Sequence, residues 1–71
     1  MKASDLISID PAVMSGTPCF RGTRVPVGVL FENLADGLSL DEILESWPSL
    51  RREDVLAVLA LASDEIIKSA A

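Results

Sequence analysis

Arginine side chains are the residues of this sequence best suited to bind a ligand. Four of the six cationic residues are arginines, and they form two close pairs, Arg21 with Arg24 and Arg51 with Arg52. A guanidinium group donates several hydrogen bonds from a planar fork that fits phosphate and carboxylate groups. The two pairs are therefore the first candidates for contacts with nucleic-acid phosphates or with an acidic group.

Acidic residues outnumber the basic ones, which gives a net charge of −5 and an isoelectric point near 4.3. Only Glu53 and Asp54 adjoin an arginine pair, so we expect separate acidic and basic faces. The overall acidity argues against general affinity for nucleic acid, because cations that neutralise phosphates supply most of the non-specific binding.

Catalytic chemistry has little support in the residue types present. The chain has no histidine and a single cysteine, Cys19, which lies in an apolar stretch and is expected to be a buried small side chain, not a nucleophile. Asp41, Glu42 and Glu45 lack the spacing of a ligand set. We therefore expect no metal, no cofactor and no enzymatic activity, and a function in binding other macromolecules.

The length and apolar content predict one small domain that associates with another chain. The chain has 71 residues, of which 49% are hydrophobic, and its mean hydropathy is +0.39. A chain this short buries only about 60% of its unfolded surface, so we expect a second copy to cover part of the apolar surface.

The same features indicate a cytoplasmic location without membrane association. The longest nearly apolar run, Val55 to Ala62, is far shorter than the about 20 residues of a membrane span. No leader-like segment opens the sequence, and a single cysteine fits a reducing compartment.

Residues 1–26 are predicted to be rich in strands. Residues 6–9 alternate in the manner of a strand. A tight turn at Arg21-Gly22, with Gly22 at positive φ, is expected to pair residues 18–20 with residues 23–25 in a hairpin. On such a hairpin Arg21 would be a possible wing contact with DNA, whereas for Arg24 we favour a structural role, tying carbonyl groups or a carboxylate of a neighbouring element.

Three helices are predicted in the rest of the chain, at about residues 27–36, 40–47 and 52–67. Gly37 is suited to end the first helix. The second helix opens with an S-x-x-E capping box formed by Ser39 and Glu42. The third helix is apolar on more than one side, which indicates burial on more than one side. We expect its second face to meet another copy through Val58, Leu59, Leu61 and Ala62.

A helix, a glycine turn, a short capped helix, a brief break and a longer helix predict a three-helix helix-turn-helix arrangement. In such a unit the second helix enters the major groove of DNA with its amino-terminal residues toward the bases. Arg51 and Arg52 would open this recognition helix. The alternative is a solvated pair of charges that Glu53 and Asp54 balance.

The chain resembles the domain of unknown function 433 family over about residues 7–66. The most specific part of the resemblance is the run Arg21-Gly22-Thr23-Arg24. The other matching segments are Ile9 to Pro11, Gly16 to Pro18, Val25 to Val27, Leu34 to Ser39, Asp41 to Ile43, Trp47 to Leu50 and Asp54 to Leu59.

The resemblance implies a winged-helix-like or homeodomain-like DNA-binding fold that is mainly helical and preceded by short strands. It also implies a frequent role as the antitoxin of a toxin–antitoxin module, with a PIN-type ribonuclease as the toxin. The family offers no established catalytic residues to carry over.

The sequence departs from the family pattern at two positions. It has Ser15-Gly16 where the family usually has two glycines or similar, and Arg51 where a threonine or serine usually caps the third helix. Arginine cannot accept a hydrogen bond from free N–H groups, which weakens the cap by about 1 kcal/mol. Either the start of this helix frays or Ser49 caps it one turn earlier.

We therefore expect an antitoxin-like protein that blocks a PIN-like ribonuclease toxin and represses its own promoter as a homodimer. The residues expected to contact operator DNA are Arg51, Arg52 and Arg21. Two alternatives are a protein interaction module that never touches DNA, which the net charge favours, and a stand-alone DNA-binding regulator.

Overall fold

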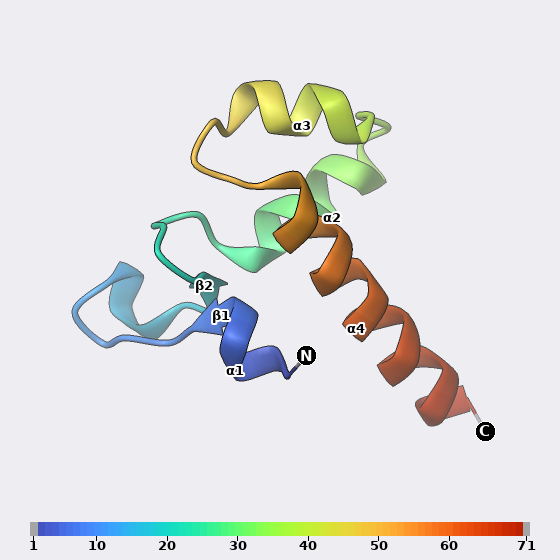
Figure 1. Ribbon diagram of the computed structural model, residues 1–71, viewed down its shortest axis with the longest axis horizontal. Coiled ribbons are helices and arrows are strands. Elements are labelled where there is room, and N and C mark those ends of the chain that lie inside the picture. Colours follow the sequence, from blue (N-terminus) through green and yellow to red (C-terminus); the bar gives the residue numbers. More distant parts are fainter. Residues whose placement is uncertain (1, 71) are drawn as a thin grey trace.

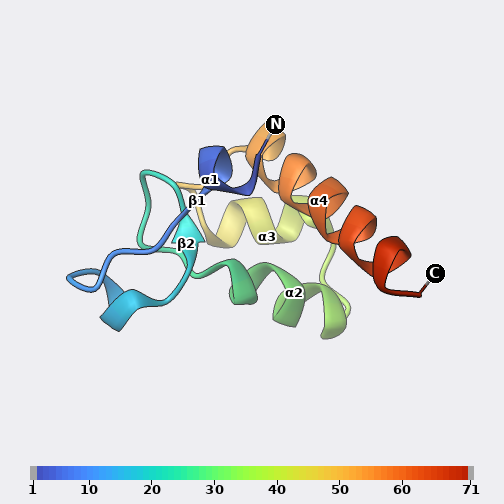
Figure 2. The same cartoon turned by 90° about the horizontal axis from the view of Figure 1, so that it is seen from below.

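The computed structural model describes residues 2–70 and shows a mainly helical fold with two short strands near its amino terminus (Figure 1). In both Figure 1 and Figure 2 the carboxyl-terminal half of the last helix extends away from the other elements. The elements in chain order are α1 (Ala3–Leu6), β1 (Ile7–Ser8), a 3₁₀ turn η1 (Met14–Gly16), β2 (Cys19–Phe20), α2 (Val27–Ala35), α3 (Leu40–Ser46) and α4 (Arg52–Ala70).

The three predicted helices are confirmed as α2, α3 and α4. α2 ends as the sequence indicates, because Gly37 adopts a φ of 92°. Its N–H donates to the carbonyl of Leu34 at 3.0 Å, and the N–H of Leu38 donates to that of Asn33 at 3.1 Å. These two bonds satisfy carbonyl groups that the helix end leaves free. α4 runs to Ala70, three residues beyond the predicted end.

The amino-terminal prediction needs one correction, because Leu6, predicted as the first residue of a strand over residues 6–9, instead ends a helical turn formed by residues 3–6. The carboxylate of Asp5 accepts a hydrogen bond from the N–H of Lys2 at 3.0 Å, and the N–H of Asp5 donates to the Lys2 carbonyl at 3.0 Å. This local capping closes the turn of α1. The strand that follows, β1, is only two residues long.

The predicted hairpin forms with a different register. Residues 18–20 pair with residues 25–27 instead of 23–25, through a bridge between Cys19 and Pro26 and a hydrogen bond from the Val27 N–H to the Pro18 carbonyl at 2.9 Å. β2 also pairs antiparallel with β1, with Ile7 opposite Phe20. The N–H of Phe20 donates to the carbonyl of Val25 at 3.0 Å, so the loop holds four residues instead of two.

The side chain of Thr23 explains this longer loop. Its hydroxyl donates to the Phe20 carbonyl at 2.7 Å and accepts from the Val25 N–H at 3.1 Å. The expected turn itself is confirmed, because Gly22 has a φ of 80° and the Thr23 N–H donates to the Phe20 carbonyl.

One hydrophobic cluster joins the strands to the helices. Val58 belongs to it with 3% of its surface exposed, which corrects the prediction that it contacts a second copy. At one turn from the fully buried Val55 it faces this chain's own core. The buried members are Leu6, Phe20, Val25, Leu30, Ile43, Leu50, Val55 and Val58.

No helix within residues 2–70 combines the length and apolar character needed to cross a membrane.

Candidate functional site: a polar cleft and an acidic helical pair

A polar cleft lies between the loop that follows β2 and the start of α4. It has a volume of about 360 Å³ and brings Arg21 and Arg51, two of the three predicted DNA contacts, to one place. The third, Arg52, does not line it. The lining residues are Asp5, Leu6, Arg21, Gly22, Thr23, Ser49, Arg51 and Asp54.

Arg21 is held by main-chain carbonyl groups of the amino-terminal segment. Its Nε and Nη2 atoms donate to the Ser4 carbonyl at 3.1 and 2.7 Å, and Nη2 also donates to the Ile7 carbonyl at 3.1 Å. Its backbone N–H donates to the Leu6 carbonyl at 2.8 Å. Arg21 therefore fastens the end of α1 and the outer edge of β1 to the loop after β2.

Arg24, unlike Arg21, is not held by the rest of the chain. Its side chain is exposed and forms no hydrogen bond or ion pair with any residue from 2 to 70. The structural role predicted for Arg24 thus belongs to Arg21. The strand register determines which arginine reaches the amino-terminal segment. Arg21 directly follows β2 and lies beside β1, whereas Arg24 lies at the other end of the four-residue loop.

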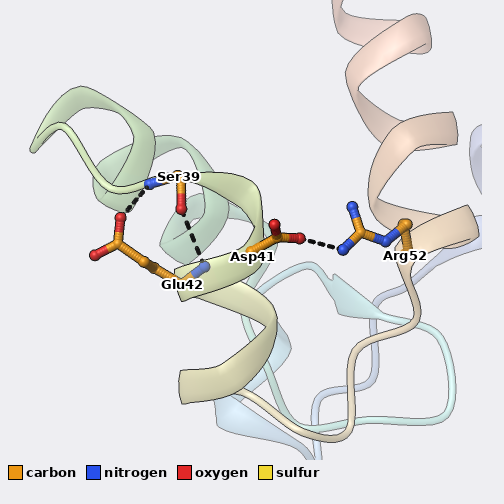
Figure 3. A network of polar contacts seen from close by, with 4 residues as sticks. All are labelled: Ser39, Asp41, Glu42 and Arg52. Carbon is orange, nitrogen blue, oxygen red and sulfur yellow. Dashed lines mark hydrogen bonds and ion pairs between the residues drawn. The ribbon is translucent and has the colours of Figure 1, made fainter.

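The start of α4 separates its two arginines. Arg52 forms an ion pair and hydrogen bond with Asp41 of α3 (Figure 3). Arg51 approaches Glu53 at 3.8 Å, with both side chains 76% exposed. Such an exposed pair contributes little, so the guanidinium of Arg51 remains available to a ligand, whereas Arg52 is engaged with α3.

Arg51 occupies the N-cap position of α4 without capping it through its side chain. Its carbonyl accepts from the N–H groups of Asp54 and Val55, both at 3.1 Å, and the helix begins at Arg52. Ser49 therefore does not start the helix one turn earlier. The sequence places Asp54 close to Arg51, but the prediction missed Asp5 as a neighbour of the two arginines in the cleft.

The capping box of α3 is confirmed (Figure 3). The N–H of Glu42 donates to the Ser39 hydroxyl at 3.2 Å, and the N–H of Ser39 donates to the Glu42 carboxylate at 3.0 Å. The hydrogen bond from the Ser39 backbone is the main cause that holds the pKa of Glu42 below its usual value, and the bond with the Ser39 side chain acts in the same direction.

The acidic charge gathers on one part of the fold, the α2–α3 segment, which we define as residues 27–50. It contains five acidic residues and no lysine or arginine, whereas the rest of the chain contains six acidic and six basic residues. The whole net charge of −5 therefore resides on α2, α3 and their turns. All five acidic side chains are exposed; they are Glu32, Asp36, Asp41, Glu42 and Glu45.

Cys19 is buried, as predicted, with 1% of its surface exposed. Its thiol lies 3.3 Å from the Thr17 carbonyl. Over residues 2–70, no three side chains of the histidine, cysteine, aspartate and glutamate types gather into a group that would hold a metal ion.

The residues predicted for self-association divide along α4. Leu59, Leu61 and Ala62 are half-buried. The most exposed apolar side chains of the helix are others, namely Leu56, Ile66 and Ile67 at 49, 68 and 65%.

A family model matches most of this chain, and one curated protein is similar to it. A family described as "Protein of unknown function (DUF433)" matches residues 7–62. The uncharacterized protein y4eO of Sinorhizobium fredii is 42% identical over 53 residues, a match that covers 75% of this chain. The chain spans only 24% of that relative's length.

A solved structure supports the same assignment. The crystal structure of a DUF433 member from Anabaena variabilis is 30% identical to this chain and superposes with a TM-score of 0.71. The match covers 89% of this chain and 62% of that one.

Proposed function

This chain belongs to the DUF433 family, and we propose that it is an antitoxin-like protein that binds a basic partner, a PIN-type ribonuclease, through its α2–α3 segment. The observation that carries this proposal is the separation of charge. Five exposed carboxylates occur between residues 27 and 50 without any cation in that stretch. Surfaces of opposite charge steer association and fix orientation.

The resemblance to the family implies a ribonuclease as the partner, and the charge of the α2–α3 segment is compatible with one. A ribonuclease draws RNA phosphates to a basic groove, and an exposed set of carboxylates competes for the same groove. The α2–α3 segment is suited to this as a preformed surface, because the capping box and the Gly37 turn hold its helices without ligand.

The experiment uses the ribonuclease that co-purifies with the tagged chain from its native host. We expect Glu32→Lys/Glu45→Lys to raise the Kd for this ribonuclease at least about tenfold and to restore RNA cleavage, since two attractive contacts become repulsive. Neither side chain takes part in a hydrogen bond or ion pair within residues 2–70.

The matched control is Asp64→Lys/Glu65→Lys, which changes the charge equally on α4. This variant should inhibit like the wild-type chain. The α2–α3 segment is ruled out as the inhibitory surface by either of two results. One is an equal loss of ribonuclease inhibition in both double variants, and the other is unchanged inhibition by Glu32→Lys/Glu45→Lys. Absence of any ribonuclease among the bound proteins rules out the antitoxin role.

A second candidate function, binding of operator DNA, rests on the polar cleft. Arg51 borders this cleft at the amino terminus of α4, where the helix dipole favours an anion. Arg24 is exposed on the facing loop. The four guanidinium groups of a dimer would give a log–log salt slope of about −3 to −4 in DNA affinity.

Titration of a fluorescent duplex that carries the promoter sequence tests this second function. Arg24→Gln/Arg51→Gln should weaken binding and flatten the salt slope, whereas Lys2→Gln/Lys68→Gln should leave both unchanged. If the wild-type chain has no duplex affinity at low salt, the chain is a protein interaction module. If it binds DNA but no ribonuclease accompanies it, the chain is a stand-alone regulator.

A further inference from the structure

We propose that two copies of this chain associate by packing the projecting halves of their α4 helices against each other in antiparallel orientation. The proposal concerns a surface separate from the α2–α3 segment and does not rest on the proposed function. The projecting half, defined as residues 61–70, extends beyond the other elements in both views (Figures 1 and 2), and every residue from 63 to 70 is exposed.

A single apolar stripe of α4 passes from the core into solvent. At 3.6 residues per turn, Val55, Leu59, Ala62 and Ile66 fall within a sector of about 60°. Val55 is fully buried, Leu59 and Ala62 are half-buried, and Ile66 is 68% exposed. The side of α4 that packs on the core therefore continues as an uncovered apolar surface.

A second stripe widens this surface. Leu56, Ala60 and Ile67 lie beside the first stripe on the helix, within a further sector of about 40°. Leu56 and Ile67 are 49 and 65% exposed. A helix with a broad apolar surface of this kind is stable in water when another apolar surface covers it.

The accessible surface of the chain points to a second copy as the occupant. The chain exposes 4866 Å², whereas a monomer of 7.6 kDa exposes about 4,300 Å². The excess of about 570 Å² approaches the about 800 Å² per partner of a typical stable interface. Two projecting halves can cover each other, because closed symmetric pairing uses the same surface on both copies.

The distribution of side-chain size favours the antiparallel orientation. Small residues, Ala62 and Ser63, lie midway between the large Leu59 and Ile66. Antiparallel helices that cross at this midpoint approach closely, and each Leu59 then meets the other copy's Ile66. A parallel pair would instead align the two helix dipoles, which is less favourable, and would bring together the two folded cores, which pack on the amino-terminal half of each α4.

Sedimentation equilibrium of the wild-type chain should give about twice the monomer mass of 7.6 kDa. Ile66→Glu/Ile67→Glu should raise the dimer Kd at least about 100-fold while leaving the circular dichroism of the fold intact, since both side chains are exposed. Ile66→Ala/Ile67→Ala should weaken the dimer in the same direction without introducing charge.

The matched control is Ile9→Glu, which places the same charge on an isoleucine that is 67% exposed outside α4. This variant should remain dimeric. A monomeric wild-type chain, a dimer that survives Ile66→Glu/Ile67→Glu, or equal dissociation by Ile9→Glu overturns the proposal.

Disulfide trapping tests the orientation. Ser63→Cys lies at the proposed crossing and should crosslink two copies, whereas Ala70→Cys should not, because its two thiols would lie about 20 Å apart along the helices. The buried Cys19 leaves the engineered thiol as the reactive one. Crosslinking at Ala70→Cys, with or without crosslinking at Ser63→Cys, overturns the antiparallel arrangement.

Discussion

Arg21 and Arg24 are identical side chains three residues apart, yet only Arg21 is held by hydrogen bonds to the chain. Its guanidinium group reaches two carbonyl groups, those of Ser4 and Ile7, at distances of 2.7 to 3.1 Å. One group thereby satisfies two acceptors, one in α1 and one in β1. An ammonium group on a flexible stem lacks this fork geometry.

This difference predicts unequal effects of one conservative change. Arg21→Lys should lower the free energy of unfolding by about 1 kcal/mol, the contribution typical of a lost hydrogen bond. Arg24→Lys keeps the same charge at an exposed site and should change it by less than about 0.5 kcal/mol. Urea denaturation of the two variants measures the difference, and equal losses would contradict the clamp role of Arg21.

Ser15 has an unfavourable backbone conformation for a residue other than glycine. It adopts a φ of 55° and a ψ of 35°, in the left-handed region that costs a residue with a Cβ atom about 1–2 kcal/mol. Glycine at the matching position of the family pattern avoids this cost.

Ser15→Gly should therefore raise the free energy of unfolding by about 1 kcal/mol. Ser46→Gly, the same exchange within helix α3, should lower it by up to about 1 kcal/mol. Thermal and urea denaturation check both, and a loss of stability with Ser15→Gly would show that the Ser15 side chain compensates for its backbone.

At the scale of the element, α3 is a helix of seven residues that depends on its first turn. Isolated helices of this length do not persist in water. The reciprocal bonds between Ser39 and Glu42 satisfy N–H groups that the helix start leaves free. They also fix the end of α3 that carries Asp41 toward Arg52 of α4.

The capping box predicts a pH dependence of stability. Folding lowers the pKa of Glu42 from its usual 4.5, so the folded state favours the carboxylate. This contribution is fully present above the unfolded pKa and is lost as the pH falls through the lower, folded pKa. Glu42→Gln should therefore be less stable than the wild-type chain at neutral pH, and the difference should shrink on acidification below about pH 4.5.

Urea denaturation between neutral and acidic pH measures the difference in stability between the wild-type chain and Glu42→Gln. Glu45→Gln, which removes a carboxylate of α3 outside the capping box, should show no such convergence with the wild-type chain. A difference between wild type and Glu42→Gln that stays constant from neutral to acidic pH would contradict the role of the ionised carboxylate.

At the scale of the whole molecule, the acidic segment and the exposed apolar surface of α4 involve different residues. The net negative charge belongs to the α2–α3 segment, and α4 carries three of the exposed large apolar side chains, Leu56, Ile66 and Ile67; the others are Ile9, Met14 and Phe31. Two binding events can therefore occur on one small chain without competing for the same residues.

Self-association predicts a stability that depends on protein concentration. A tenfold increase in concentration should stabilise a folded dimer by about 1.4 kcal/mol, which raises the Tm by several degrees in a domain of this size. Ile66→Glu/Ile67→Glu should have a Tm that does not change with concentration. Scanning calorimetry over a hundredfold range measures both, and a constant Tm of the wild-type chain would contradict the dimer.

Local signals in the sequence determined the helices and their ends. Ser39 with Glu42, and Gly37 after α2, act through hydrogen bonds to residues within five positions, so neighbouring residues suffice to predict them. The same holds for the positive φ of Gly22. The separation of charge between residues 27–50 and the rest of the chain is also a property of the sequence alone.

Only the tertiary structure decided which arginine supports the fold and which apolar residues remain exposed. The role of Arg21 depends on carbonyl groups 14 and 17 positions earlier, and the antiparallel pairing of β1 with β2 brings them together. Val58 and Ile66 are both apolar residues of α4, but the first lies over the core and the second beyond it. Burial depends on where the other elements end, and no local pattern contains that information.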